Sequence, residues 1–269
     1  MPVEKWNPKN PWIFSKKTAF MQRIADKVRG GCTQYIQGSC KAQKLPFLTH
    51  KLSERYPLNR PKITQARRRK AGENAYHWMG YLEPDTQLIH WLVLLAPGET
   101  LDATDAWKDP RLDKVRLTGY ELVRLTRPGA AAPSWSWRYS RERHDQLRTA
   151  LVSAIRGRRN LELEQLAHSI WRSPGFAGVR EQVKKMRSLI TSEWKRSRSK
   201  AEVMPDLPRQ IGFVRRLADV GQPWSDLMKA VKHERVQEEG GNRQNPVPVP
   251  RRAGPKAQEN RAGGEGKGV

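Results

Sequence analysis

The hydrophobic pattern of this chain changes its period twice, and this change constrains the fold more than any other feature of the sequence. Over residues 73–139, apolar and aromatic residues form short runs and alternations, which are typical of β-strands. On either side, apolar residues recur every three or four positions, as in amphipathic helices. The sequence therefore predicts an α+β fold, with basic helices before the sheet and a helical bundle after it.

Two hairpins account for the predicted sheet. The first joins residues 76–82 to residues 87–95, and the second joins residues 120–126 to residues 134–139, each across a turn that contains proline. The simplest arrangement of these segments is a roughly four-stranded, mostly antiparallel sheet.

Composition divides the chain into four segments. We expect a basic helical segment over residues 1–72, the sheet over 73–139, and a helical segment over 140–235 that packs on the sheet, all within one folded unit. Residues 236–269 contain no Leu, Ile or aromatic residue. Such a segment buries too little apolar surface to offset the entropy lost on ordering, so we expect a disordered tail.

The charged residues are also distributed unevenly along the chain. The chain has 51 Lys and Arg against 27 Asp and Glu, a net charge of +24. Residues 1–72 hold 17 basic against 3 acidic residues, and residues 140–200 hold 15 against 6, whereas residues 73–139 hold 7 against 9. A single basic run is usually a solvated helix face. Because two separate segments share the bias, we expect a polyanionic partner, nucleic acid in preference to a membrane surface.

Other features of the sequence point to a cytoplasmic protein that does not act at a membrane. No apolar run approaches the roughly 18 residues that would span a bilayer. The first 17 residues lack the apolar stretch of a signal peptide. Cys32 and Cys40 are too few for a disulfide scaffold, and we expect them to be reduced.

The predicted phosphate contacts are cations that a fold of this kind would leave on its surface. Four are consecutive near the end of the first segment, three belong to the second hairpin, and five share one flank of a long helix over residues 176–198. The candidates are Arg67, Arg68, Arg69, Lys70, Arg124, Arg127, Arg138, Arg180, Lys184, Arg187, Lys195 and Arg198.

Aromatic residues alternate along the last predicted strand. Trp135, Trp137 and Tyr139 fall on one face of it. Such a row can stack unpaired bases in a single-strand binder, or it can form a core face that the later helices cover. The pattern alone leaves both interpretations open.

Two histidines give the chain a possible catalytic site. If Leu82 pairs with Gln87, His77 and His90 project from one face of the first hairpin as diagonal neighbours and could hold a divalent metal. The alternative is that both histidines simply pack at a half-buried sheet surface. No metal-binding motif is present, so we expect no cofactor unless the protein is a nuclease that uses Mg²⁺ or Mn²⁺.

The segment HWLVLL, which begins at His90, resembles the histidine strand of single-strand nicking initiators of plasmid replication and transfer. Those proteins combine that strand, in a five-stranded sheet, with a tyrosine nucleophile. A nicking enzyme of this kind would use His77 and His90, with Tyr120 or Tyr139, as its catalytic candidates. The chain departs from the pattern because Leu88 stands where the family places its second histidine.

Three further segments, YELVRLTRPG (120–129), SWSWRY (134–139) and SPGFAGVR (173–180), together resemble a family carried by plasmids and integrative conjugative elements of proteobacteria. The resemblance covers most of residues 15–217. It implies a role in the replication, transfer or maintenance of mobile DNA, with other replication or transfer proteins as partners. It assigns no residue a catalytic role.

The sequence thus predicts a nucleic-acid-binding protein of a mobile genetic element that contacts the phosphate backbone, with DNA favoured over RNA. Two alternatives are a metal-dependent single-strand nicking endonuclease and an RNA-binding or RNA-processing protein.

Overall fold

The computed structural model describes residues 6–99, 106–126, 129, 131–208 and 211–230, with only the backbone of Lys62. The contacts divide the chain after Met228. Every element named below belongs to the part before this division. The predicted α+β class is confirmed. The predicted tail, residues 236–269, lies outside the described residues.

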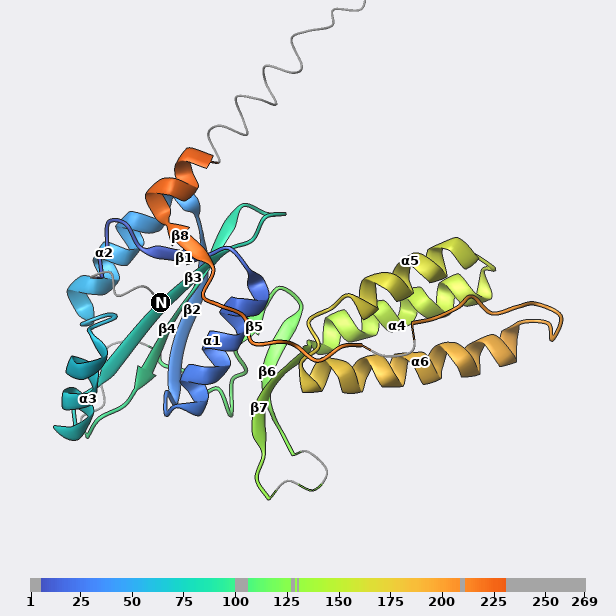
Figure 1. Cartoon of the computed structure of the whole chain (residues 1–269), viewed down its shortest axis with the longest axis horizontal. Helices are drawn as coiled ribbons and strands as arrows, with labels where there is room; N and C mark the ends of the chain where they lie inside the picture. Colours follow the sequence, from blue (N-terminus) through green and yellow to red (C-terminus); the bar gives the residue numbers. More distant parts are fainter. Residues whose placement is uncertain (1–5, 100–105, 127–128, 130, 209–210, 231–269) are drawn as a thin grey trace, which may run out of the picture. The chain divides into compact units, whose positions relative to one another are not determined.

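A five-stranded mixed sheet forms the larger of two sheets (Figure 1). β1 pairs with β3 in parallel, and the other neighbouring strands pair antiparallel. The hydrophobic pattern does not predict β1, β2 or β8, which come from segments expected to be helical or irregular. The strand order is β2 (Gln34–Lys41), β4 (Leu88–Ala96), β3 (Ala75–Leu82), β1 (Trp12–Phe14) and β8 (Gly221–Pro223).

The first predicted hairpin forms as β3 and β4, but its register differs from the expected one. Leu82 pairs with Ile89 rather than with Gln87. Gln87 instead lies in the loop with a φ of 54°, so its backbone turns the chain and cannot join the ladder. As a result His90 lies opposite Tyr81.

The second predicted hairpin belongs to a separate three-stranded antiparallel sheet of β5 (Arg116–Leu117), β6 (Tyr120–Leu125) and β7 (Ser134–Tyr139). Two sheets therefore replace the single four-stranded sheet that was expected. The reason is that α1 (Lys17–Arg29) contacts both β3 and β7 and lies between them. The indole Nε1 of Trp137 donates a buried 2.8 Å hydrogen bond to the backbone oxygen of Met21 in α1.

The remaining helices lie in two groups (Figure 1). One follows β2 and flanks the larger sheet: a 3₁₀ turn, η1 (Ala42–Lys44), then α2 (Leu45–Arg55) and α3 (Lys62–Lys70). The other is a bundle beside β7: α4 (Arg141–Arg156), α5 (Asn160–Trp171) and α6 (Ala177–Ser197). The predicted N-terminal helices and C-terminal bundle are thus confirmed.

The bundle meets the smaller sheet where α6 crosses β7. A Cβ on Gly178 would lie 2.7 Å from the backbone oxygen of Trp137 and 2.8 Å from the Cβ of Arg138. Only glycine lets the helix approach the strand this closely. Val183 and Ile190 then join a continuous buried core that includes Trp137.

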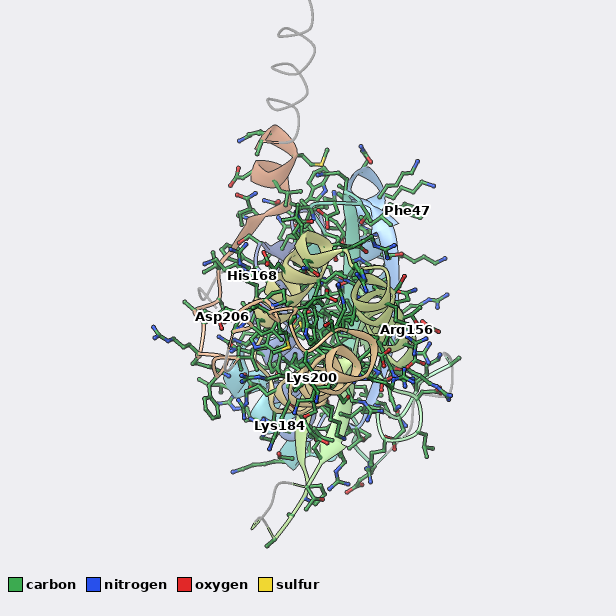
Figure 2. All side chains as sticks on the ribbon, turned by 90° about the vertical axis from the view of Figure 1, so that its right-hand side faces the viewer. Phe47, Arg156, His168, Lys184, Lys200 and Asp206 are labelled. Atoms are coloured by element: carbon green, nitrogen blue, oxygen red, sulfur yellow. The ribbon has the colours of Figure 1, made fainter. Side chains whose placement is uncertain are left out.

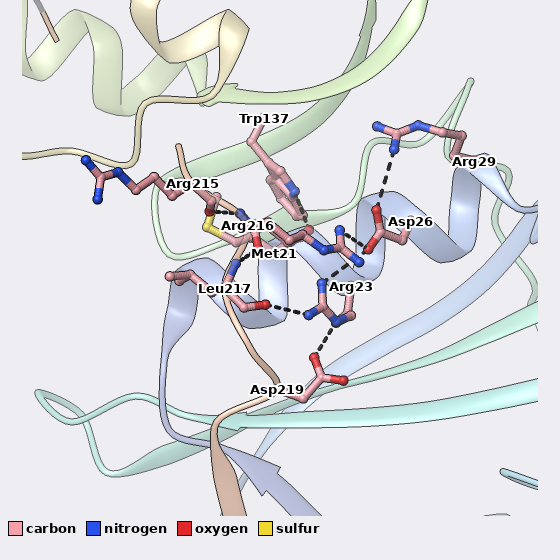
Figure 3. Close-up of polar contacts among 10 residues, drawn as sticks. Met21, Arg23, Asp26, Arg29, Trp137, Arg215, Arg216, Leu217 and Asp219 are labelled. Carbon is pink, nitrogen blue, oxygen red and sulfur yellow. Dashed lines mark hydrogen bonds and ion pairs between the residues drawn. The ribbon is translucent and has the colours of Figure 1, made fainter. Parts of the chain in front are cut away.

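Residues 211–220, which we call the strap, return the chain from the bundle to the larger sheet along α1 (Figure 3). The Arg23 guanidinium donates a 2.6 Å hydrogen bond to the backbone oxygen of Leu217 and pairs with Asp219. Gln22 accepts a 3.0 Å hydrogen bond from the backbone nitrogen of Leu217. These contacts hold the strap along α1, and β8, which follows it, pairs with β1.

Candidate nucleic-acid interface

The most basic surface comes from residues 41–70, which we call the basic layer. They run from the end of β2 through η1, α2 and α3. This stretch holds five Lys and five Arg, and Glu54 is its only acidic residue. The layer is anchored to the larger sheet by apolar and polar contacts: Tyr56 stacks on Tyr76 with ring centres 4.8 Å apart, and the Asn59 side chain bonds the backbone of Trp78.

The end of α3 carries the four consecutive cations that the sequence singled out. Arg67, Arg69 and Lys70 are exposed and form no ion pair with any residue that the structure describes. Arg68 is engaged, because its guanidinium lies 3.0 Å from the Glu73 carboxylate and donates to the backbone oxygen of Asn74. Three of the four predicted contacts are therefore available to a phosphate.

The positive field of this region acts on His77, which lies on the face of β3 toward α1. The Lys27 Nζ is 3.1 Å from the His77 Nδ1. Burial, with a smaller contribution in the same direction from the charges of Lys27 and Arg69, lowers the pKa of His77 to about 3. His77 is thus a neutral packed residue at neutral pH. Nearby Cys32 is also buried, and burial raises its thiol pKa to about 11.

The arginines of the second hairpin differ in their availability. Arg124 is exposed, with its guanidinium carbon 6.0 Å from the centre of the Trp135 ring. Arg138 is half-buried and donates a 2.7 Å hydrogen bond to the Glu121 carboxylate. Arg127 lies outside the described residues. Of these three predicted contacts, the structure leaves Arg124 open to solvent.

The predicted flank of α6 is largely engaged in structure. Arg198 is 8% exposed, and its guanidinium bonds Glu202 and Asn160, each at 2.7 Å. Arg180 donates to the backbone oxygen of Gly175 and lies over the Phe213 ring. Arg187 is half-buried, whereas Lys184 and Lys195 are exposed (Lys184 is labelled in Figure 2). Burial thus removes Arg198 from the set that a phosphate could reach.

A carboxylate within the bundle pairs with further arginines. Glu193 accepts hydrogen bonds from Arg156 at 2.6 Å and from Arg196 at 2.6 and 2.8 Å. These hydrogen bonds lower the pKa of Glu193. The charge excess of residues 140–200 is therefore partly compensated in the fold.

The aromatic row on β7 is part of the core. Trp137 and Tyr139 are buried together with Leu122 in the core shared by the smaller sheet and the bundle, and Trp135 is half-buried against it. The core interpretation of this row is confirmed. Trp137 and Tyr139 are therefore not accessible to stacked bases.

A pocket of about 530 Å³ lies beside the start of α4 and the end of α5. Tyr120 and Tyr139 form part of its wall and stack with ring centres 5.3 Å apart. The Tyr139 hydroxyl donates a 2.5 Å hydrogen bond to the Ser173 Oγ. The Lys17 Nζ lies 5.5 Å from the centre of the Tyr120 ring, and it also pairs with Glu83.

Two of the four catalytic candidates line this pocket, and a third lies next to one of its wall residues. Tyr120 and Tyr139 line it, and His90 lies behind its wall residue Glu83, with the His90 Nε2 3.7 Å from the Glu83 Oε2. Neither of those two atoms has a hydrogen-bond partner among the described residues. His77 is not part of this group, because the observed register places it four residues from the strand position opposite His90.

The pKa shifts of these side chains do not favour an ionised tyrosine that could act as a nucleophile. Burial raises the pKa of Tyr139 to about 12 and also raises that of Tyr120, although the hydrogen bond to Ser173 acts in the opposite direction. Burial lowers the pKa of His90, against the effect of Glu83. Within the described ranges, no group of three or more His, Cys, Asp and Glu side chains could hold a metal ion.

Comparison with known proteins gave no match, whether with family models, with curated proteins or with solved structures. In the described part of the chain, no helix is both long and apolar enough to cross a bilayer.

Sequence reasoning missed part of the basic layer. Lys44, Lys51 and Arg60 are exposed there, as is Phe47 on α2. The signal that could have found them is the charge of residues 41–70 counted as one unit, since a single acid interrupts ten cations.

Proposed function

We propose that this protein binds nucleic acid through the phosphate backbone, with the basic layer as the principal contact surface. The observation that carries the proposal is the concentration of ten cations and one acid in residues 41–70, together with the exposure of Arg67, Arg69 and Lys70. Closely spaced phosphates attract such a surface and release bound counterions when they are neutralised. Lys184, Lys195 and Arg124 add secondary contacts.

The biological setting of the proposal rests on the sequence. The resemblance to proteins of plasmids and integrative conjugative elements favours DNA over RNA, and it favours action in replication, transfer or maintenance with other proteins of those processes. A cytoplasmic location agrees with Cys32 and Cys40, which form no disulfide.

A salt titration tests the proposal. Full-length protein is titrated against labelled single-stranded and duplex DNA in gel-shift assays at several salt concentrations. Affinity should fall steeply with salt, with a log–log slope near −0.9 per phosphate contact on duplex and near −0.7 on single strands. Affinity that does not change with salt would contradict the proposal.

A second candidate function is single-strand nicking, and one observation favours it: Glu83, Tyr120 and Tyr139 line one pocket, and His90 lies 3.7 Å from the Glu83 carboxylate. The sheet that carries His90 also has five strands, as in the nicking initiators. The neutral tyrosines and the absence of a second histidine at Leu88 speak against it.

A cleavage assay separates the function classes. Labelled single-stranded DNA, duplex DNA and RNA are incubated with the protein and Mg²⁺ or Mn²⁺, and in parallel with a chelator. Binding without cleavage is the expected result. Metal-dependent cleavage that is lost in His90→Ala and kept in His77→Gln would establish the nicking function instead. Tighter binding to RNA than to DNA would favour the RNA-binding alternative.

A further inference from the structure

The basic layer exposes an aromatic ring that its own helix does not use for packing. α2 buries Leu45, Thr49 and Leu52 toward the protein. Phe47 lies on the outer surface of the same helix with 77% of its surface exposed (Figure 2). An exposed ring buries little apolar surface, so Phe47 contributes little to the stability of the fold.

The neighbours of this ring on α2 are predominantly positive. Lys44, the last residue of η1 and the N-cap of α2, precedes Phe47 by three residues, and Lys51 on α2 follows it by four, so both lie about one helical turn away on the same side. His50 also shares this side, and its ring lies 3.6 Å from the carboxylate of Glu54. A phosphate on either side of the ring would therefore meet a lysine.

We propose that the basic layer binds single-stranded nucleic acid, with an unpaired base stacked on Phe47 and the flanking phosphates held by Lys44 and Lys51. This inference rests on the proposed function and adds the strand preference to it. Bases in a duplex stack on each other and leave no face for a protein ring, whereas an unpaired base can stack on an aromatic side chain. The cations of α3 then follow the strand as further phosphate contacts.

The surface fits a nucleic-acid strand better than an anionic membrane. An interfacial membrane helix buries a broad apolar face, whereas the outer face of α2 presents one ring among charged side chains. On α3, Ile63 is the corresponding exposed apolar residue, and Arg67 follows it by one turn. Isolated apolar side chains among cations suit separate bases along a charged backbone.

The test compares oligo(dT) with a mixed-sequence duplex of the same length. Phe47→Ala should weaken binding of the single strand by about 5- to 100-fold, the range for loss of one base–aromatic stack. Duplex binding should change by less than about twofold, and the salt slope on both ligands should stay the same because no charge is lost. Phe47→Leu, which keeps an apolar side chain but no ring, should behave like Phe47→Ala.

Phe213→Ala is the matched control. Phe213 is 78% exposed, but its ring lies under Arg180, 3.7 Å from the guanidinium carbon to the ring centre. Its removal should leave both affinities unchanged. Thermal melts of all variants confirm that the fold is retained.

The outcomes separate this inference from the proposed function. If wild-type protein binds neither ligand, the proposed function is wrong. If it binds both with steep salt dependence and Phe47→Ala has no effect, or weakens both ligands equally, only the strand inference is wrong. Binding of phosphatidylserine vesicles that requires Phe47, without binding of oligo(dT), would overturn the inference in favour of a membrane surface.

Discussion

The basic layer and the helical bundle are both rich in Lys and Arg, but they use this charge differently. In the layer, Glu54 is the only acid among ten cations of residues 41–70. In the bundle, Glu193 binds Arg156 and Arg196, and Arg198 is buried against Glu202. The comparison teaches that a positive segment leaves cations available to a partner only where the fold places few carboxylates within their reach.

The two regions also affect neighbouring ionisable groups in opposite ways. Near the layer, burial favours the neutral form of His77 and the charges of Lys27 and Arg69 act in the same direction, so the pKa of His77 falls. In the bundle, cations hydrogen-bond a carboxylate and favour its charged form, so the pKa of Glu193 falls. The two shifts have different main causes, burial for His77 and hydrogen bonds from arginine for Glu193, and they should produce losses of stability in different ranges of pH.

The largest expected effect tests the comparison directly through binding. The triple variant Arg67→Gln/Arg69→Gln/Lys70→Gln should bind single-stranded DNA about a hundredfold weaker at about 0.1 M salt, because each lost phosphate contact costs about fivefold there. The log–log salt slope should become shallower by about 2. Gel-shift titrations over salt measure both quantities.

The matched control also removes three positive charges, from the exposed lysines Lys184 and Lys195 of α6 and from Lys200, which follows the helix. Lys184→Gln/Lys195→Gln/Lys200→Gln should weaken binding by less than about tenfold, since Lys184 and Lys195 are only secondary contacts outside the layer. If the two triple variants lost the same affinity, the layer would not be a distinct interface. Binding would then depend only on the net charge of the protein.

A smaller effect concerns stability between about pH 6.5 and pH 5. The unfolded chain binds a proton at His77 below pH 6.5, whereas the folded chain does so only near pH 3, so the native state binds fewer protons in this range. The contribution of His77 is complete above pH 6.5 and declines as pH falls. At about 1.4 kcal/mol per pH unit, the free energy of unfolding should drop by about 2 kcal/mol from pH 6.5 to pH 5.

Urea denaturation of wild type and His77→Gln over this pH range measures the effect. The variant lacks the titrating ring, so its free energy of unfolding should depend less on pH by that amount. Identical pH dependence in the two proteins would show that His77 is charged or solvated in the native state.

The smallest effect belongs to the bundle. Glu193→Gln should lower the melting temperature by a few degrees at pH 7, because Arg156 and Arg196 lose a charged acceptor. The pKa of Glu193 is lowered on folding, so its contribution is complete above the ordinary carboxyl pKa of 4.5 and disappears as pH falls through the lower folded value. The difference between wild type and variant should therefore shrink below pH 4.5.

Melting curves recorded at pH 7 and at pH 3.5 check this prediction, with Glu181→Gln as the control. Glu181 forms an exposed pair with Lys185 on the same helix, and such pairs contribute little. If both variants melt at the same temperature at pH 7, the ion pairs of Glu193 do not contribute to the stability of the bundle.

Sequence patterns predicted the helices and both hairpins because these elements are specified by neighbouring residues. The apolar stripe of α6 and the two strands on either side of Pro84 are examples. β1 and β8 escaped prediction because each is three residues long and forms only against a distant strand. The hairpin register escaped it because it depends on the backbone conformation of Gln87.

The candidate site was predictable to a similar extent. Arg67, Arg69 and Lys70 follow one another and could not all be buried on one face of a helix, so the sequence sufficed to place them on the surface. Arg198 has the same charge and a regular helical spacing, yet its guanidinium is buried. Its partner Asn160 lies 38 residues away, and only the folded bundle brings the two together.

The sequence by itself determined the α+β class, the excess of positive charge and its concentration in residues 41–70, since these depend on residue types and local spacing. The tertiary structure decided how the strands assemble into two sheets, which cations pair with carboxylates inside the fold, and that Phe47 is left in solvent. The physical reason is that strand pairing, ion pairing and burial act between atoms that are close in space. In this chain those atoms lie up to about 200 residues apart in sequence, as in the pairing of β1 with β8.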